Sequence, residues 1–422
     1  MTPELWWQEG VPPVSIRLHP QKGEALSKYG EEVPWCPTGR YLPERPVFTL
    51  DPHFHAGAYY VQEASSMFLT SLAHLFKEQK IRRVLDLCAA PGGKSTLLAE
   101  LLDPDGFLVA NEVIKSRVGV LAQNMAKWGY AHVAVTNNDA KDFSRLPHCF
   151  DAILADLPCS GEGMFRKDPQ AMQAWSPDAV RLCADRQRRI VADVWEALRP
   201  GGYLIYSTCT FNRLENEENV SWICDSLGAS ICPVPVHPDW GILEQEGCYR
   251  FLPYRLRGEG LFFALLQKHD RDNPFLRKPS RTNRRAEQQG PVGWLDASCG
   301  LFAKGDLIKA LPVDWAPEVG TWEALLRVVQ SGVAVARFKG KEWIPQADLA
   351  FAPILRIDAF PVVEVDLSVA LRYLAKESFA LPGAPIGYIM IAYQGNRLGF
   401  AKNLGSRINN LYPSSSRIRM GI

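Results

Sequence analysis

Two cysteines, Cys159 and Cys209, are the strongest candidates for chemistry in this sequence. Cys159 lies in "ADLPCSGEGMFRKDP" (155–169) and Cys209 lies in "YSTCTFNRLENEENV" (206–220), and each segment begins at the end of a predicted strand. The carboxyl ends of parallel strands meet at one edge of a sheet, so we expect both thiols at that edge. Because only a few per cent of a free thiol is ionised at neutral pH, a nucleophilic cysteine needs a nearby cation or helix N-terminus.

The residues after Cys209 predict such a helix N-terminus. Asn212 and Glu215 have the spacing of a capping box, although the acids of "ENEEN" are also explained by the helix dipole alone. A helix that began here would place Cys209 just before its first turn. Residue types alone leave open which of the two thiols attacks.

A glycine-rich turn, "LDLCAAPGGKST" (85–96), lies between the first predicted strand of the α/β region and a helix expected to begin near Ser95. Its glycines permit a sharp turn and a close approach of the backbone to a ligand at the helix N-terminus. The segment matches neither the Walker A pattern nor G-x-G-x-x-G. It therefore predicts a ligand site, but neither of those two phosphate-binding motifs.

Three carboxylates end the next predicted strands. Glu112 follows the second strand, Asp139 the third and Asp156 the fourth. An acidic residue about 20 positions after the glycines can bond ribose hydroxyls. Carboxylates at three successive strand ends favour a positively charged ligand that contains a nucleoside, so the sulfonium of S-adenosylmethionine fits better than a pyrophosphate. Lys94 is the one feature that points towards a phosphate instead.

Alternating strand and helix patterns divide the chain into regions. Short apolar strands alternate with helical segments over 79–270, which predicts a doubly wound α/β sheet that ends in an antiparallel hairpin, "FLPYR" and "GLFFALLQ". An extension rich in proline and aromatic residues precedes it (1–78), and a basic linker follows (271–290). The remainder, 291–422, is predicted to be a separate α+β module or pair of modules.

Composition sets the class of protein. The 422 residues carry a net charge of +1, with 22% charged and 47% hydrophobic residues, as in an ordinary globular protein. We find neither an apolar run of membrane length nor a signal peptide, and therefore expect a cytoplasmic protein without a membrane partner. The ten cysteines form no CxxC pair, and His53 and His55 have no further ligands at zinc spacing, so no metal is expected.

The C-terminal segment is basic although the chain as a whole is nearly neutral. Residues 378–422 hold five Lys or Arg and no Asp or Glu, which predicts a surface that faces phosphates. "MFRK" (164–167) adds two cations near Cys159. The candidate RNA-binding residues are Arg166, Lys167, Arg397, Lys402, Arg407 and Arg417.

Several of these motifs together resemble those of a known family. "DLCAAPGGKS", "NE" at 111–112, "ND" at 138–139, "DLPCSGEGMFRKDP" and "YSTCTFNRLENEENV" are similar to motifs of the Sun-type (Fmu/NSUN) RNA 5-methylcytosine methyltransferases. "AGAYYVQEASSM" and "VPWCPTGRYL" also match, and "GMFRKDP" and "YQGNRLGFAKNLGSRINNLYPSSSRIR" resemble the bacterial RsmF type. The resemblance covers nearly the whole chain, with His19 a departure at a position where the family usually has Asn.

The resemblance implies a fold and a set of roles. The fold would be a Rossmann-like class I methyltransferase sheet with an N-terminal RNA-binding extension and a C-terminal α+β PUA-like region that binds RNA. Cys209 would attack carbon 6 of cytosine, Cys159 would assist release of the adduct, and Asp156 would orient or protonate the base. S-adenosyl-L-methionine would be held by Cys88, Ala89, Ala90, Pro91, Gly92, Gly93, Lys94, Glu112, Asp139 and Asp156.

The resulting expectation is a monomeric RNA cytosine-5 methyltransferase that acts on 16S ribosomal RNA in the small subunit. It would act on a cytosine that is lifted out of its stack. A tRNA target and a catalytically silent RNA-binding assembly factor remain alternatives; a dehydrogenase is disfavoured by the missing G-x-G-x-x-G and by the two thiols. The sequence alone does not decide which thiol attacks, because DNA cytosine methyltransferases attack from a Pro-Cys loop. Cys209 is preferred to Cys159 on the family pattern and on its predicted position before a helix.

Overall fold

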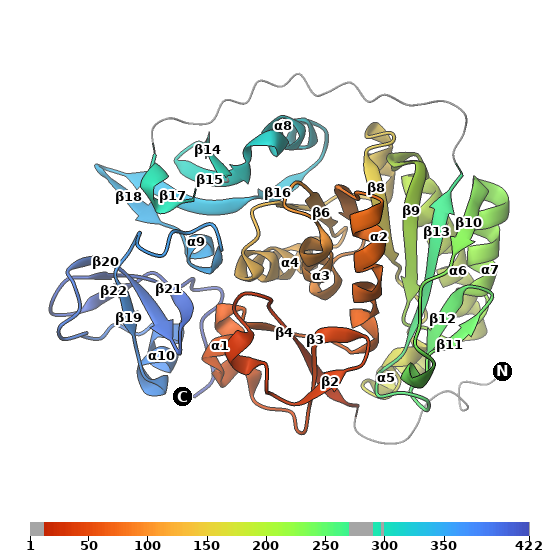
Figure 1. The fold of residues 1–422 in the computed structure, drawn as a ribbon, viewed down its shortest axis with the longest axis horizontal. Helices are drawn as coiled ribbons and strands as arrows, with labels where there is room; N and C mark the ends of the chain where they lie inside the picture. Colours follow the sequence, from red (N-terminus) through yellow and green to blue (C-terminus); the bar gives the residue numbers. More distant parts are fainter. Residues whose placement is uncertain (1–11, 270–289, 297–298, 422) are drawn as a thin grey trace.

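A ten-stranded mixed sheet forms the centre of the protein in the computed structural model, which describes residues 12–269, 290–296 and 299–421 (Figure 1). Its order is β11-β12-β13-β9-β8-β5-β6-β7-β16, with β10 paired to β13. The parallel strands are β5 (Arg83–Asp86), β6 (Phe107–Asn111), β7 (Val133–Thr136), β8 (Phe150–Asp156) and β9 (Leu198–Thr208). The antiparallel strands are β10 (Ala229–Cys232), β11 (Leu243–Gln245), β12 (Cys248–Phe251), β13 (Leu261–Lys268) and β16 (Val328–Ser331). The doubly wound sheet and its late hairpin are therefore confirmed, although β12 begins at Cys248 and ends where the predicted strand began.

The strand order reverses between β5 and β8. From β5 the chain adds β6 and then β7 on one side, and afterwards returns to place β8 and β9 on the other. Open α/β sheets bind ligands at such a switch point, outside the carboxyl ends of the strands. The glycine-rich turn follows β5 and the Cys159 segment follows β8, so the two lie on either side of this point.

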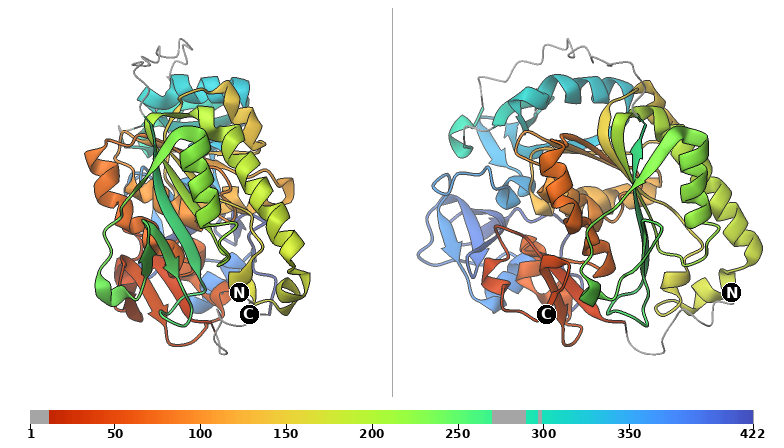
Figure 2. Two further views of the ribbon diagram at one scale, coloured as in Figure 1. Left: turned by 90° about the vertical axis from the view of Figure 1, so that its right-hand side faces the viewer. Right: turned by 45° about the vertical axis from the view of Figure 1, so that its right-hand side comes forward.

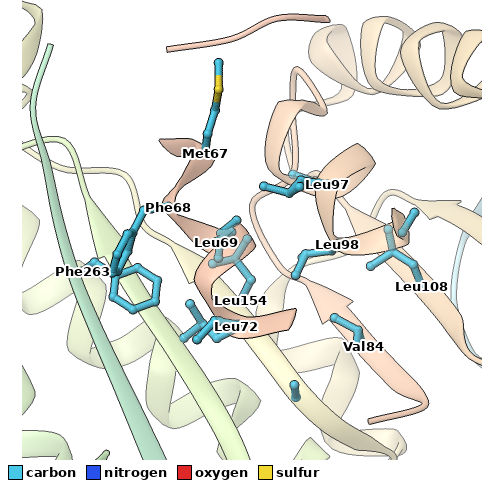
Figure 3. Packing of buried hydrophobic residues seen from close by; sticks show 14 of the residues in the cluster. Met67, Phe68, Leu69, Leu72, Val84, Leu97, Leu98, Leu108, Leu154 and Phe263 are labelled. Atoms are coloured by element: carbon cyan, nitrogen blue, oxygen red, sulfur yellow. The ribbon is translucent and has the colours of Figure 1, made fainter. Parts of the chain in front are cut away.

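Helices cover both faces of this sheet, because its strands are apolar on both sides (Figures 1 and 2). One face packs against the segment 65–72 and helices α2, α3 and α4, and Figure 3 shows this core around Phe68, Leu98 and Leu154. The other face packs against α6, α7 and α8. The helices of the sheet domain are α2 (Ala73–Glu78), α3 (Gly93–Leu101), α4 (Lys115–Trp128), α5 (Pro169–Ala174), α6 (Pro177–Val194) and α7 (Glu217–Trp222).

The N-terminal extension forms a small sheet of its own, with the order β2-β3-β1-β4. Its elements are β1 (Val14–Leu18), β2 (Glu31–Val33), β3 (Cys36–Leu42), α1 (Pro52–Ala56) and β4 (Tyr59–Val61). Arg17 is fully buried and joins this sheet to α3, because its guanidinium pairs with Glu100 and donates to Thr96. Residues 65–78 pack on the central sheet instead, within the region that we predicted as the extension.

The C-terminal region contains two further four-stranded sheets (Figure 1). The first holds β14 (Cys299–Lys304), β15 (Leu307–Pro312), β17 (Val333–Lys339) and β18 (Glu342–Pro345), with α8 (Ala316–Leu325) and α9 (Ala347–Phe351). The second holds β19 (Val362–Glu364), α10 (Leu367–Leu374), β20 (Gly387–Tyr393), β21 (Asn396–Asn403) and β22 (Ile408–Asn410). The prediction of a separate C-terminal module was wrong in one respect: β16 leaves the region and pairs with β7, at the edge of the central sheet.

The linker predicted at 271–290 lies outside the described residues except for Gly290. Within the described part of the chain, no helix has both the length and the apolar character that crossing a membrane requires.

Candidate active site

Cys159 and Cys209 lie side by side at the carboxyl edge of the sheet. Their Sγ atoms are 3.2 Å apart, and both cysteines are free. Cys159 follows β8 and Cys209 follows β9, and these strands are parallel neighbours, so the sheet itself brings the two thiols together. The prediction that they converge is confirmed.

The two thiols are not equivalent. The hydrogen bond between the two sulfurs lowers the pKa of Cys209, and the ammonium of Lys94 also lowers it, against the opposing effects of burial, Asp156 and Glu215. The same hydrogen bond, together with burial, raises the pKa of Cys159. Cys209 is therefore the thiol whose ionisation the site favours, and Cys159 is the thiol whose ionisation it disfavours.

Asp156 connects the glycine-rich turn to the thiols. One carboxylate oxygen accepts from Lys94 Nζ at 2.8 Å and the other accepts from Ser207 Oγ at 2.6 Å. Lys94 lies in the first turn of α3 and Ser207 lies in β9, two residues before Cys209. The aspartate, the lysine and the two thiols thus form one connected group.

Glu215 is a site residue that the sequence analysis considered only as a helix cap. Its carboxylate is buried and accepts from the backbone N–H of Ser160 at 3.0 Å, from Gln187 Nε2 at 2.7 Å and from Asn212 Nδ2 at 2.8 Å. Asn212 belongs to the Cys209 segment and Ser160 to the Cys159 segment, so one carboxylate ties both cysteine loops together. The expected capping box at 212–215 was wrong: α7 begins at Glu217, and Asn212 and Glu215 close a turn before it.

Glu162 forms a second connection between the Cys159 and Cys209 segments, which the sequence analysis did not predict. Its buried carboxylate accepts from the N–H of Phe211 at 2.7 Å and from Trp175 Nε1 at 3.1 Å. In the same turn, the N–H of Gly163 donates to the carbonyl of Cys209 at 2.8 Å. A Cβ at Gly163 would come within 2.7 Å of that carbonyl oxygen, so only glycine allows this approach. The spacing "CSGEGM" was the available signal, because two glycines flank a carboxylate next to a candidate nucleophile.

The glycine-rich turn is held rigidly in place. Gly92 has a φ of 114°, in the left-handed region, and immediately precedes α3, which begins at Gly93, two residues earlier than predicted. Arg117 of α4 donates to the carbonyl of Ala90 at 2.6 Å and Asn124 donates to that of Pro91 at 2.8 Å. The turn is therefore fixed from outside by α4, with the N–H groups of the first turn of α3 directed to the sheet edge.

The carboxylates around this turn suit a cationic ligand. Asp86 is fully buried at the end of β5, where Ser95 Oγ donates to one oxygen at 2.7 Å and the other oxygen has no partner among the described residues. Burial raises the pKa of Asp86 to about 7, with Asp156 and Glu112 raising it further. Burial and the same three carboxylates raise the pKa of the Cys88 thiol. An unpaired buried oxygen within a group of carboxylates fits a ligand that brings positive charge and hydrogen-bond donors.

Glu112 and Asp139 occupy the predicted strand ends. The Glu112 side chain is buried, accepts from the N–H of Ile114 at 2.8 Å and lies 3.4 Å from Arg117. Asp139 caps the short 3-10 helix Ala140–Arg145 and keeps its side chain half-buried. The structure places both at the edge that carries the glycine-rich turn, but their contact with a ligand stays a prediction.

The predicted RNA-binding cations lie in different surroundings. Near the thiols, Arg166 donates to the carbonyl of Gly258 and Lys167 pairs with Glu259. In the last sheet, Lys402 pairs with Glu342 at 2.8 Å. Arg397 is half-buried, and Arg407 and Arg417 are exposed.

Among the described residues, no group of three or more His, Cys, Asp or Glu is arranged to hold a metal ion. His53 and His55 of α1 bond to the C-terminal region instead. His53 Nε2 lies 3.2 Å from Gln394 Oε1, and His55 Nδ1 lies 3.0 Å from the hydroxyl of Tyr412. The two rings join the N-terminal extension to the last sheet.

We expect Glu215→Ala to separate the two cysteine loops. The substitution leaves the N–H of Ser160 without its side-chain acceptor and removes one of the two acceptors of the Gln187 amide, which keeps the carbonyl of Pro158. An unsatisfied buried donor costs about 1–3 kcal/mol, so thermal unfolding should show a loss of that order and the reactivity of Cys209 towards a thiol reagent should change. Glu215→Gln keeps an acceptor oxygen and serves as the matched control. Equal reactivity and stability in Glu215→Ala and the unchanged protein would contradict the proposed tie.

A Rossmann-like sheet with carboxylates and a glycine-rich turn at its switch point, and a thiol pair beside them, defines the class: an α/β methyltransferase. Comparisons with known proteins agree. Residues 73–267 match the family described as 16S rRNA methyltransferase RsmB/F, 7–64 match the N-terminal domain of 16S rRNA methyltransferase RsmF, and 360–418 match the methyltransferase RsmF PUA domain. The chain belongs to the RsmB/F family of 16S rRNA methyltransferases.

Individual relatives extend over nearly the whole chain. The sequence is 36% identical to ribosomal RNA small subunit methyltransferase F of Serratia proteamaculans over 411 residues, which cover 91% of this chain and 84% of that protein. It is 33% identical to the protein of the same name from Escherichia coli, over 90% of this chain and 83% of that protein. Among solved structures, a methyltransferase homologue from Pyrococcus horikoshii has a TM-score of 0.53 at 28% identity, and the match covers 62% of this chain and 88% of that one.

Proposed function

We propose that this protein transfers a methyl group from S-adenosylmethionine to carbon 5 of a cytidine in small-subunit ribosomal RNA, with Cys209 as the nucleophile. The observation that carries the proposal is the 3.2 Å separation of the Cys209 and Cys159 sulfurs beside Asp156 and Lys94. Membership of the family supports the reaction and the class of RNA.

The residues of this chain perform distinct parts of the reaction. The Cys209 thiolate adds to carbon 6 of the cytosine, and the electron pair of the broken double bond makes carbon 5 nucleophilic. S-adenosylmethionine, when bound, supplies the methyl group that carbon 5 accepts. Lys94 and Ser207 fix the carboxylate of Asp156, which orients the base.

Product release requires a base. After methylation carbon 5 still carries its hydrogen; removal of that proton re-forms the double bond and expels the Cys209 sulfur with its electron pair. Cys159 is the group beside Cys209 that can take the proton as a thiolate. Once the sulfur of Cys209 is bonded to carbon it no longer carries a negative charge, so the interaction that raises the pKa of Cys159 weakens at this stage.

The carboxylate group and the glycine-rich turn would hold the methyl donor. Asp86 offers an unpaired buried oxygen, and Glu112 and Asp139 stand at the ends of the adjacent strands. The positive charge of a sulfonium and an amino group complements these acids. Cys88, Ala89, Ala90, Pro91, Gly92 and Gly93 form the turn against which the donor would lie.

Mapping of methylated cytidines tests the function. The purified protein and S-adenosylmethionine are incubated separately with small ribosomal subunits and with tRNA from a strain in which the gene is deleted, and 5-methylcytidine is read by bisulfite sequencing. We expect new 5-methylcytidine in 16S RNA, with an inactive Cys209→Ala protein as the control. Methylation of tRNA alone would replace the proposed substrate, and methylation of neither RNA would overturn the proposed function.

Lys94→Gln is expected to move the acid limb of the pH–rate profile to higher pH. In the unchanged protein the Lys94 ammonium lowers the pKa of Cys209, so the thiolate forms at lower pH. Its removal also leaves the Asp156 carboxylate without its 2.8 Å partner, and an unneutralised carboxylate disfavours the thiolate further. Single-turnover rates from pH 5 to 10 measure the shift. An unchanged acid limb would show that Lys94 does not act on the attacking group.

A further inference from the structure

Two adjoining cavities lie where the N-terminal extension, helix α4 and the C-terminal tail meet. The first has a volume of about 480 Å³ and the second about 380 Å³. They share Thr49, Phe54 and Lys127 in their walls, so they adjoin one another across these side chains. We call it the α4 groove.

The charged side chains that line the α4 groove are all cationic. Arg45 and Lys127 line the first cavity, Lys127, Arg417 and Arg419 line the second, and no Asp or Glu lines either. Within the described part of the chain, no carboxylate lies within ion-pair distance of these four cations. By contrast, Lys402 and Lys167 on other surfaces are paired.

Lys127 is the most confined of these cations. Its ammonium lies 4.3 Å from the centre of the Phe54 ring, and burial lowers its pKa to about 8. Lys127 is half-buried, so its ammonium is only partly hydrated, and an anionic ligand compensates for the hydration that it has lost. The position therefore favours an anion as the occupant.

Two partly exposed aromatic rings, Phe54 and Tyr60, line the first cavity beside Arg45 and Lys127. The other rings of the lining, Phe48, Tyr59, Trp128 and Tyr412, are buried. Sites for single-stranded nucleic acid combine positive charge for the backbone with rings on which bases stack. A small anion would need the charge but not the rings.

The groove adjoins the glycine-rich turn. Asn124, in the wall of the first cavity, donates to the carbonyl of Pro91 in the glycine-rich turn at 2.8 Å. Tyr60, in the same wall, lies against the turn as well: a Cβ at Gly93 would be 3.2 Å from its ring. A strand that followed the groove from Arg417 would reach the turn that precedes Lys94.

We propose that the α4 groove binds a single-stranded RNA segment that flanks the target cytidine, with phosphates at Arg45, Lys127, Arg417 and Arg419 and bases stacked on the rings of Phe54 and Tyr60. The proposal rests on the proposed function for the identity of the ligand as RNA. It gives the C-terminal tail a defined role, since Arg417 and Arg419 would guide the strand from the last sheet towards the turn.

Charge removal at one end of the groove tests the proposal. The variant Arg417→Gln/Arg419→Gln is compared with Lys339→Gln/Lys341→Gln, which removes the same charge from exposed residues of the β17–β18 hairpin that do not line the groove. Binding of a fluorescein-labelled single-stranded oligoribonucleotide is measured by anisotropy over a range of salt concentrations, without the methyl donor. We expect the slope of log K against log salt to fall by about 1.4 in the first variant, at ~0.7 per phosphate, and to stay unchanged in the second. Equal slopes in both variants would overturn the proposal.

Two further variants test the middle of the groove. Lys127→Met keeps the length of the side chain without its charge, and Phe54→Leu keeps an apolar residue without the ring. Loss of a stacked base should weaken oligoribonucleotide binding by about 5- to 150-fold in Phe54→Leu. Thermal unfolding and calorimetric binding of S-adenosylmethionine confirm that each variant is folded. Folded variants with undiminished RNA affinity would contradict the proposal that the α4 groove binds RNA.

The outcomes separate this proposal from the proposed function. A protein that binds RNA through the groove but methylates neither ribosomal RNA nor tRNA would refute the proposed function and would still support RNA binding in the groove. A protein that methylates 16S RNA while all groove variants retain full affinity would support the proposed function and refute RNA binding in the groove.

Discussion

Cys209→Ala is expected to abolish methyl transfer while leaving the affinity for S-adenosylmethionine nearly unchanged. The Cys209 sulfur is the one whose pKa its neighbours lower, through the hydrogen bond with Cys159 and the charge of Lys94. Removal of a covalent nucleophile typically costs about 10⁴-fold or more in rate, because the remaining groups cannot replace the bond it forms. Transfer of a tritium-labelled methyl group to RNA measures the loss, and calorimetry measures the cofactor affinity.

A thiol outside the site provides the control. Cys224 is half-buried and lies six residues beyond Glu218. It does not belong to the pair formed by Cys159 and Cys209, whose sulfurs are 3.2 Å apart, so Cys224→Ala should retain full activity. If Cys209→Ala retained turnover and Cys159→Ala lost it, the nucleophile would be Cys159. The roles of the two thiols would then be the reverse of those proposed here.

The meeting of the two thiols could be predicted from sequence because it depends on sheet topology alone. Each cysteine follows a strand within three positions, and adjacent parallel strands place their ends together whatever the loops do. The glycine-rich turn and the carboxylates Glu112 and Asp156 were predictable for the same reason. Their relation to the sheet is fixed by short distances along the chain.

The ties between the loops could not be predicted, because they join residues far apart in the sequence. Glu215 reaches Ser160, 55 residues earlier, and Glu162 reaches Phe211, 49 residues later. The local sequence pattern led to a wrong prediction at Asn212 and Glu215. These residues have the spacing of a capping box, but the Glu215 carboxylate accepts a hydrogen bond from the Cys159 loop, and the helix begins later, at Glu217. A local motif is overruled when a buried partner from elsewhere offers stronger hydrogen bonds.

The position of β16 has a similar origin. Residues 328–331 read as a short apolar strand within the C-terminal region, and periodicity gives no indication of which sheet such a strand joins. The edge of β7 would otherwise present unpaired backbone groups, and β16 covers it. The C-terminal region is thereby anchored to the sheet that carries the site.

Cys159→Ala is expected to trap a covalent complex between the protein and its RNA. Addition of Cys209 and methylation of carbon 5 do not need Cys159, but release needs a base for the proton on carbon 5. Cys159 is the group whose sulfur lies 3.2 Å from that of Cys209. Without it the adduct should accumulate when the variant is incubated with RNA and S-adenosylmethionine. Electrophoresis under denaturing conditions detects it as a slowly migrating band.

The double variant Cys159→Ala/Cys209→Ala decides which bond the band contains. It should give no band, because the sulfur that bonds to carbon 6 is absent, whereas Cys159→Ala/Cys224→Ala should give the full band. Absence of a band in Cys159→Ala itself, with turnover retained, would exclude Cys159 as the release base. The proton would then have to leave to another group at this edge of the sheet, for which the Asp156 carboxylate, held by Lys94 and Ser207, would be the candidate.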